Sequence, residues 1–514
     1  MTFTSYQFFL FLPTALLIYF LIPGKLRTLW LVMTSFAFIW YFNPKYLLVL
    51  LVSAGISYGT ALILDQINGK PDREEDGKTA GGENKVQIYK KKKTVAAAGI
   101  LSVIGILILF KYMDFLLENI NQIFHLSGEQ VIANPFSLIA PVGIAYYTLQ
   151  VIGYIVDVYR GKIRAERNIL CYLLYVAYFP KIISGPIERA DAFLEQTHDC
   201  KNWKLWNWER ISAGLTLMVW GYFQKLVIAD RLAIFVEEIF KNYMQYGTIE
   251  LVAGITLFFI QLYADFLGYM NIAQGVSNIM GFTLQENFNA PYFAKSVREY
   301  WSRWHISLST WLKDYVYIPL GGNRKGLLRK NSNLVLTFLV SGLWHGASWS
   351  FLFWGGIHGI YQIGEHWLEP VADRVNEKLH TRTESFGYKL MQVTKMWVLN
   401  ILAMIFFKCA TARDAIAYIG RIFSKWDPWV IFDGSLYTFG VDEKYFKVVV
   451  LSVILFFIVD WMKYKRGERI DSWLSRQCIW FRWGFLMMVI LACVVFGAYG
   501  PTYDAVNFIY FQFN

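Results

Sequence analysis

Two histidines lie inside a stretch of 34 residues, 331–364, that contains no Asp, Glu, Lys or Arg. An ionisable side chain at membrane depth is costly and therefore often functional. A neutral imidazole can accept a proton, so His345 and His358 are candidates for general acid–base chemistry. For either histidine taken alone, a structural imidazole that bonds to a neighbouring helix is an equal alternative.

Small residues surround His345. Gly342 and Gly346 flank it at a spacing of four residues, and Ser341, Ala347 and Ser348 are also small. Such residues let a neighbouring backbone or a slim substrate approach closely, although the same spacing serves ordinary packing of membrane helices. This setting ranks His345 first among the candidates.

His358 lies between Gly356 and Gly359, also among small residues. In one straight helix the thirteen residues from His345 to His358 would separate them by about 20 Å, on faces about 140° apart. They would then not act as a pair. A turn near residues 355–356 would let them approach, so His358 ranks well below His345.

A third histidine, His305, lies in a basic segment. At 100° per residue an apolar face about 120° wide collects Trp301, Trp304, His305, Leu308, Trp311, Leu312 and Tyr315. This pattern predicts an amphipathic helix at the membrane interface, anchored by its three tryptophans. On that face His305 either is buried at the interface or forms one wall of a site.

The sequence PLGGNRKG, residues 319–326, follows this helix. Its glycines can expose backbone N–H groups beside Arg324 and Lys325, a combination suited to phosphate. Asn323 belongs to the same turn, and Arg298 and Arg303 lie upstream. A plain cytoplasmic turn is the alternative, because basic residues gather on the cytoplasmic side in any case.

The elements that must position these residues are membrane helices. Of the 514 residues 56% are hydrophobic and 17% are charged, whereas soluble proteins carry about 25% charged residues. This largely excludes a cytosolic enzyme. About 20 apolar residues span a bilayer, and the uncharged runs predict an all-α polytopic protein of roughly ten to twelve membrane helices, with re-entrant and interfacial helices. The net charge of +11 is typical of basic cytoplasmic loops rather than of nucleic-acid binding.

Basic residues also give the orientation. Three segments are rich in Lys and Arg, namely 70–93, 160–167 and 298–330, so all three are expected in the cytoplasm and the N-terminus outside. Residues 65–94 are predicted to form a mobile, charged cytoplasmic loop. We expect one integral-membrane domain, 1–514, with the catalytic segment at 295–365.

The five cysteines are Cys171, Cys200, Cys409, Cys478 and Cys493, and no two of them form a CxxC pair. They predict neither a disulfide framework nor a zinc site. No metal ligand set is expected, and the thiols are interpreted as small buried apolar groups.

Several long segments carry a family resemblance. They are QFFLFLP, LFKYMDFLLENIN, PVGIAYYTLQVIGYIVDVYRGKI, FPKIISGPIERA, YADFLGYMNIAQGVSNIMGF, WHISLSTWLKDYVYIPLGGNR and SGLWHGASWSFLFWGGIHG. In this order they resemble the membrane-bound O-acyltransferase family, in particular its bacterial branch of alginate O-acetylation proteins. The resemblance covers about residues 6–365, while the C-terminal third fits in hydropathy alone.

The resemblance implies a helical fold around a tunnel, with His345 as the near-invariant histidine of the family and His305 near the cytoplasmic mouth. It implies no bound cofactor, but acetyl-CoA or a carrier-bound acyl thioester as donor substrate. The implied partners are membrane lipid, an extracytoplasmic acetyltransferase and a polysaccharide acceptor, at a bacterial cytoplasmic (inner) membrane. Candidate substrate-binding residues are Trp304, Trp344, Asn323, Arg324, Lys325 and Arg303.

In the mechanism that fits these residues, His345 takes the proton of an acceptor hydroxyl while His305 helps to bind or polarise the donor. Direct transfer is preferred, because no GxSxG nucleophile motif is visible. The alternatives are a saccharide exporter, D-alanyl or other acyl transfer to teichoic acid, lipid or protein, and a structural membrane subunit. Paired charges inside the spans or inverted repeats would favour the exporter, and neither is visible in the sequence.

Overall fold

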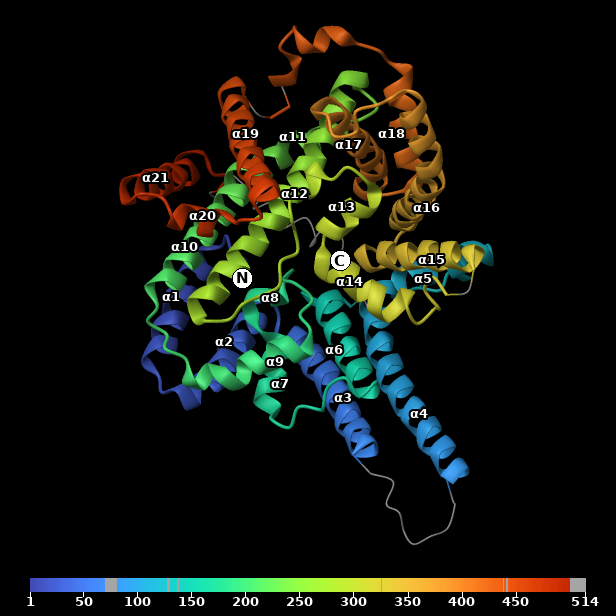
Figure 1. The fold of residues 1–514 in the computed structure, drawn as a ribbon, viewed down its shortest axis with the longest axis vertical. Coiled ribbons are helices and arrows are strands. Elements are labelled where there is room, and N and C mark those ends of the chain that lie inside the picture. Colours follow the sequence, from blue (N-terminus) through green and yellow to red (C-terminus); the bar gives the residue numbers. More distant parts are fainter. Residues whose placement is uncertain are drawn as a thin grey trace. The chain divides into compact units, whose positions relative to one another are not determined.

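The computed structural model describes residues 1–69, 81–126, 130–135, 138–324, 326–437, 439–440 and 442–499 (Figure 1). Within these ranges the chain is helical, and an isolated bridge joins Phe288 and Trp304. The prediction of an all-α fold is confirmed.

Seven helices in the described ranges are long and apolar enough to cross a membrane: Pro44–Asn68, Val86–Ile123, Trp208–Lys241, Thr248–Met280, Phe386–Lys408, Glu443–Arg466 and Ile479–Phe496. Two shorter apolar helices, Tyr6–Leu21 and Ile169–Ile182, accompany them. The chain is therefore a multi-pass membrane protein.

The first of two compact units comprises Met1–Trp208 and Ser277–Gln285. Its helices are α1 (Tyr6–Leu21), α2 (Arg27–Phe42), α3 (Pro44–Asn68), α4 (Gly81–Leu107), α5 (Met113–Ile123), α6 (Ile144–Tyr159), α7 (Ile169–Ala177), α8 (Phe179–Ile182) and α9 (Ala190–Asp199). Helices α3, α4 and α6 lie side by side (Figure 1). Asn43 caps α3 by accepting the N–H of Lys45, and Pro44 occupies the first helical position, which needs no N–H donor.

The predicted charged loop at 65–94 is partly helical. Helix α3 continues to Asn68 and α4 begins at Gly81, so the lysines of residues 90–93 lie on a helix. Four consecutive lysines interrupt the recurrence of apolar residues every 3.6 positions by which an amphipathic helix is recognised in a sequence. Residues 70–80 lie outside the described ranges.

The second unit comprises Glu209–Val276 and the chain from Glu286 onward. Its helices are α10 (Trp208–Tyr222), α11 (Asp230–Lys241), α12 (Thr248–Met280), α13 (Val297–Arg303), α14 (Ile306–Leu312), α15 (Leu327–His345), α16 (Trp349–Lys378), α17 (Phe386–Lys408), α18 (Ala412–Ser424), α19 (Glu443–Arg466), α20 (Ile470–Ser475) and α21 (Ile479–Phe496).

A buried ion cluster links α12 to the π-helical segment Phe223–Ala229 between α10 and α11. The ammonium of Lys225 lies 2.8 Å from a carboxylate oxygen of Asp230 and 2.7 Å from one of Asp265. Buried charges persist where they are paired in this way. The cluster therefore fixes one turn of each helix against the other. Lys225 and Asp265 lie within the candidate spans Trp208–Lys241 and Thr248–Met280, so the expectation that the spans contain no paired charges was wrong.

The uncharged stretch 331–364 is divided between α15 and α16, which pack against each other. The chain turns at residues 346–348, and Ser348 caps α16 by accepting the N–H of Phe351. The turn near residues 355–356 that would let the two histidines approach is absent, because Gly355 and Gly356 lie inside α16. Gly355 serves close helix packing instead, because a Cβ atom on it would lie 2.2 Å from the carbonyl oxygen of Phe338.

Candidate functional site

Two of the three candidate histidines meet inside the second unit. The imidazole centroids of His305 and His345 are 6.3 Å apart, with the rings inclined at 71°. Both side chains are buried, His305 with 1% and His345 with 3% of its surface exposed. Forty residues of sequence separate them, so the convergence comes from tertiary structure.

His345 is positioned by the end of a helix. It is the last residue of α15, and the following Gly346 is extended with φ −163°. Its ring lies edge-on to three aromatic rings, at 4.8 Å from Trp344, 5.0 Å from Trp354 and 5.4 Å from Phe407. Packing on several sides restricts the imidazole to a narrow range of orientations, as a group that must meet a substrate atom requires.

His305 lies between two short helices rather than within one. Its φ of 44° and ψ of 55° are left-handed values that break the chain between α13 and α14. The predicted continuous amphipathic helix over 301–315 was therefore wrong. A non-glycine residue in this region costs energy and persists where its surroundings enforce it.

The tryptophans of that segment also differ from the prediction. Trp301, Trp304 and Trp311 are 8%, 2% and 6% exposed, so they pack inside the protein rather than anchor an interfacial helix. Trp304 contacts Phe288, Tyr292 and Tyr300. The prediction of an apolar face was correct, but this face packs against other parts of the protein rather than against the membrane interface.

Burial sets the protonation state of His305. The residue lies outside the seven candidate spans, and removal of the imidazole from water lowers its pKa to about 3. A ring with this pKa is neutral at neutral pH. A neutral imidazole offers one N–H donor and one nitrogen lone pair.

Trp344 joins the two histidines. Its ring lies 5.6 Å from that of His305 and 4.8 Å from that of His345, edge-on to both. Phe266 also packs edge-on against His305, at 4.9 Å between ring centroids. Of the two predicted tryptophans, Trp344 thus contacts both imidazoles, whereas Trp304 packs into the aromatic layer beside them.

The predicted basic residues lie apart from this pair. Arg303 donates from Nε to Glu299 at 2.9 Å and lies over the ring of Tyr464. Asn323 and Arg324 are exposed in the turn before α15, where the hydroxyl of Tyr317 donates to Asn323. Lys325 lies outside the described residues. Phosphate binding by this turn stays a prediction.

His358 is brought near His345 indirectly. Trp354 lies 5.0 Å from each of the two rings. Trp301 contacts His358 at 5.0 Å and Trp354 at 5.9 Å, so the three rings pack together. Trp354 and Phe407 were not among the candidates predicted from the sequence. Trp354 could have been found from its spacing, because it precedes His358 by four residues and so shares a helix face with it; Phe407 carries no such signal.

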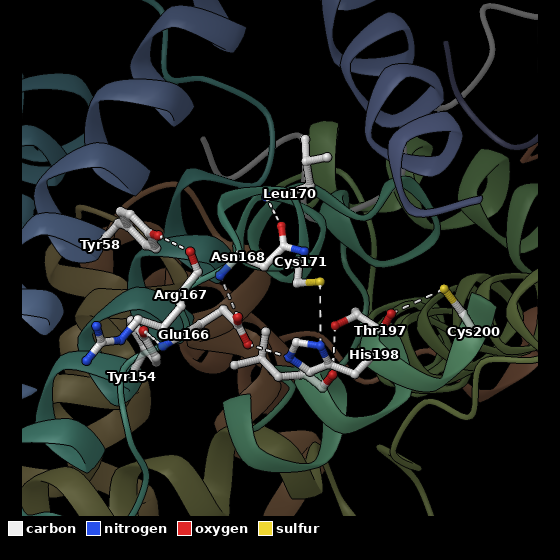
Figure 2. Close-up of polar contacts among 11 residues, drawn as sticks. Tyr58, Tyr154, Glu166, Arg167, Asn168, Leu170, Cys171, Thr197, His198 and Cys200 are labelled. Carbon is white, nitrogen blue, oxygen red and sulfur yellow. Dashed lines mark hydrogen bonds and ion pairs between the residues drawn. The ribbon is translucent and has the colours of Figure 1, made fainter. Parts of the chain in front are cut away.

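A second group with catalytic residue types lies in the first unit (Figure 2). The Nε2 of His198 lies 2.7 Å from Glu166, and its Nδ1 lies 4.0 Å from the sulfur of Cys171. An acid, an imidazole and a thiol in this order can form a nucleophilic triad. Here, however, Cys171 is 3% exposed and burial raises the pKa of its thiol, which disfavours the reactive thiolate.

The backbone before α7 explains this group more simply. Glu166 also accepts the N–H of Asn168, whose side chain in turn accepts the N–H of Leu170 (Figure 2). The group therefore caps α7 and ties it to α9. In the described ranges no three His, Cys, Asp or Glu side chains are placed to hold a metal ion.

Comparison with known proteins defines the class. The model of the membrane-bound O-acyltransferase family matches residues 162–409, which include both histidines. The chain is 35% identical over 407 residues to a probable alginate O-acetylase of Azotobacter vinelandii, covering 78% of this chain and 74% of that protein. It is 32% identical over 441 residues to a peptidoglycan O-acetyltransferase of Helicobacter pylori, covering 79% and 77%.

A more distant relative is the teichoic acid D-alanyltransferase of Bacillus subtilis, which is 29% identical over 261 residues, 47% of this chain and 64% of that protein. The chain belongs to the membrane-bound O-acyltransferase family. It is a multi-pass membrane acyltransferase.

Proposed function

We propose that the protein transfers an acetyl group from a cytoplasmic thioester to a hydroxyl group, with His345 as general base. The observation that supports this most is the approach of the His305 and His345 rings to 6.3 Å inside a buried, aromatic environment. A buried neutral imidazole can accept a proton without first losing one.

In the proposed reaction the acceptor oxygen attacks the thioester carbonyl as His345 takes the hydroxyl proton. The tetrahedral intermediate collapses, the carbon–sulfur bond breaks, and the thiolate leaves with the proton from the imidazolium. The products are an ester and a thiol, so no proton is gained or lost overall. His305, neutral at physiological pH, helps to bind or polarise the donor from the cytoplasmic side.

The acceptor is proposed to be an extracytoplasmic polysaccharide, reached directly or through an extracytoplasmic acetyltransferase partner. The relatives named as alginate and peptidoglycan O-acetylating enzymes support this class of acceptor. The proposed donor is acetyl-CoA or an acetylated carrier, whose phosphate groups are attracted by Arg324 and Lys325. The reaction needs no bound cofactor. The proposed location of the protein is a bacterial cytoplasmic (inner) membrane, where lipid surrounds it and its N-terminus lies outside.

The test uses purified wild-type protein and His345→Ala with radiolabelled acetyl-CoA and, separately, with a labelled acetyl carrier. Thioester consumption and ester formation are measured with a polysaccharide acceptor. Wild type is expected to consume one of the donors and His345→Ala to be inactive, with unchanged membrane insertion. Full activity of His345→Ala, or no turnover of either donor by wild type, would overturn the proposal.

D-alanyl transfer is the second candidate, because a teichoic acid D-alanyltransferase matches 47% of this chain. The same assay with a D-alanyl carrier distinguishes the two. Turnover of the D-alanyl donor in preference to both acetyl donors would support this candidate and overturn acetyl transfer.

A further inference from the structure

The reaction proposed above needs a donor for the oxyanion that forms on the thioester carbonyl. Such a donor lowers the barrier most when it is fixed in advance in a site that excludes water. The sequence analysis identified the base but no group for this role. The donor must point N–H or O–H into the same space that the base addresses.

Trp354 has the properties of that donor. Its side chain is 1% exposed, and its indole N–H finds no acceptor among the described residues. A buried donor without a partner is destabilising, so its persistence calls for an explanation. An oxygen supplied by the substrate would provide one.

Its position relative to the base is also suitable. The centroid of the Trp354 ring is 5.0 Å from that of His345, and the rings are inclined at 87°. The two rings are therefore direct neighbours, one edge-on to the other. Phe407 packs against both side chains, at 5.2 Å from Trp354 and 5.4 Å from His345, and helps to fix them relative to each other.

The face of α16 that carries Trp354 also carries two other buried polar side chains. Ser350 lies one turn earlier and His358 one turn later, both 1% exposed and both without a hydrogen-bond partner in the described part of the chain. A simple packing face would be apolar. Three polar side chains at four-residue spacing instead define a polar strip that begins beside His345.

We propose that Trp354 is a catalytic residue whose indole N–H donates to the thioester carbonyl oxygen as it becomes an oxyanion. The inference rests on the proposed acyl transfer. As the acceptor oxygen adds to the carbonyl carbon, the carbonyl π electrons move onto oxygen and the Trp354 N–H stabilises the new charge. When the carbon–sulfur bond breaks, the carbonyl re-forms and the hydrogen bond weakens.

The test replaces the N–H while keeping the ring. Trp354→Phe retains an aromatic face, and replacement of Trp354 by benzothienylalanine retains the bicyclic shape with sulfur in place of N–H. Both are expected to lower kcat by about 100-fold or more, the usual effect of losing one oxyanion donor, with little change in KM. The donor used is whichever of acetyl-CoA or the acetyl carrier wild type turns over.

Trp301→Phe is the matched control. Trp301 also has a buried N–H without a partner in the described residues, and its ring lies 5.0 Å from that of His358 and 5.9 Å from that of Trp354. Its kcat is expected to stay within a few-fold of wild type. An equal loss in Trp301→Phe, or near-normal kcat in the benzothienylalanine protein, would overturn the assignment of Trp354.

The outcomes separate the two proposals. If wild type is active, His345→Ala is inactive and Trp354→Phe keeps its kcat, acyl transfer stands and the role of Trp354 falls. If wild type consumes neither donor, acyl transfer falls and the assignment of Trp354 falls with it.

Discussion

The side-chain oxygen of Asn287 accepts the backbone N–H of Ser307 at 3.2 Å. The carbonyl of Asn287 also accepts the N–H of Ile306 at 3.0 Å, so one residue satisfies the first two donors after His305. Together these bonds fix the start of α14 and favour the left-handed backbone of His305. Asn287 is thus a positioning residue for the candidate site.

Replacing Asn287 by Leu should therefore affect both stability and transfer. The buried N–H of Ser307 loses its partner, and we expect a loss of about 1–3 kcal/mol in stability. Transfer should fall more in kcat than in KM, because the His305 ring is misplaced rather than removed. Thermal unfolding in detergent and kinetics check this, and an unchanged melting temperature would contradict it.

The variant His305→Gly distinguishes the contribution of the His305 backbone conformation from the contribution of its imidazole ring. Glycine adopts a φ of 44° without the steric cost that His305 bears, so the variant is expected to keep its fold, with the relieved strain offsetting part of the cost of losing a buried ring. Transfer is expected to fall steeply. His305→Val is the matched contrast, since a β-branched residue is strained at this φ. Retained transfer in His305→Gly would remove the ring from the mechanism.

The buried neutral state of His305 predicts a pH dependence of stability. Its pKa is about 3 in the folded protein and near the ordinary value of 6.5 when unfolded. Between these values the unfolded chain binds the extra proton, so stability is full above about pH 6.5 and falls as the pH drops toward 3. His305→Asn lacks this contribution, and its melting temperature should fall less than that of wild type between pH 7 and pH 5. Parallel curves would contradict the prediction.

Whether a feature of the fold or of the site could be predicted from the sequence depends on how far apart in the sequence the interacting residues lie. The membrane helices and the rank of His345 follow from local pattern, and the structure has seven helices long and apolar enough to cross a membrane in its described ranges. The uncharged run 331–364 gave no sign of the break between α15 and α16. The approach of His305 to His345 does not follow from spacing, since the two positions are forty residues apart in the sequence. The break at His305 was missed because histidine gives no glycine-like signal for a left-handed backbone.

Lys225 is expected to be essential for stability. Lys225→Met leaves Asp230 and Asp265 as two buried carboxylates without their shared ammonium. Breaking a buried ion pair by removing one partner costs about 3–5 kcal/mol. Adding Asp230→Asn and Asp265→Asn to Lys225→Met should recover part of the loss, because the unpaired charges are removed. Thermal unfolding of the single and triple variants measures this, and a triple variant less stable than Lys225→Met would contradict it.

The close packing of α15 and α16 positions His345, and neighbouring glycines offer a matched test. A Cβ on Gly355 would lie 2.2 Å from the carbonyl oxygen of Phe338, whereas a Cβ on Gly356 would meet the side chain of Leu339 at 3.7 Å, an ordinary contact. Gly355→Ala must push the helices apart, because the obstacle is backbone. Overpacking of this kind costs about 1–3 kcal/mol, and the shift of α15 should also lower kcat.

Gly356→Ala, with no clash to relieve, is expected to keep stability and transfer at or above wild type, because alanine favours a helix. Equal behaviour of the two variants, in unfolding temperature and in kcat, would show that the spacing of α15 and α16 does not set the position of His345.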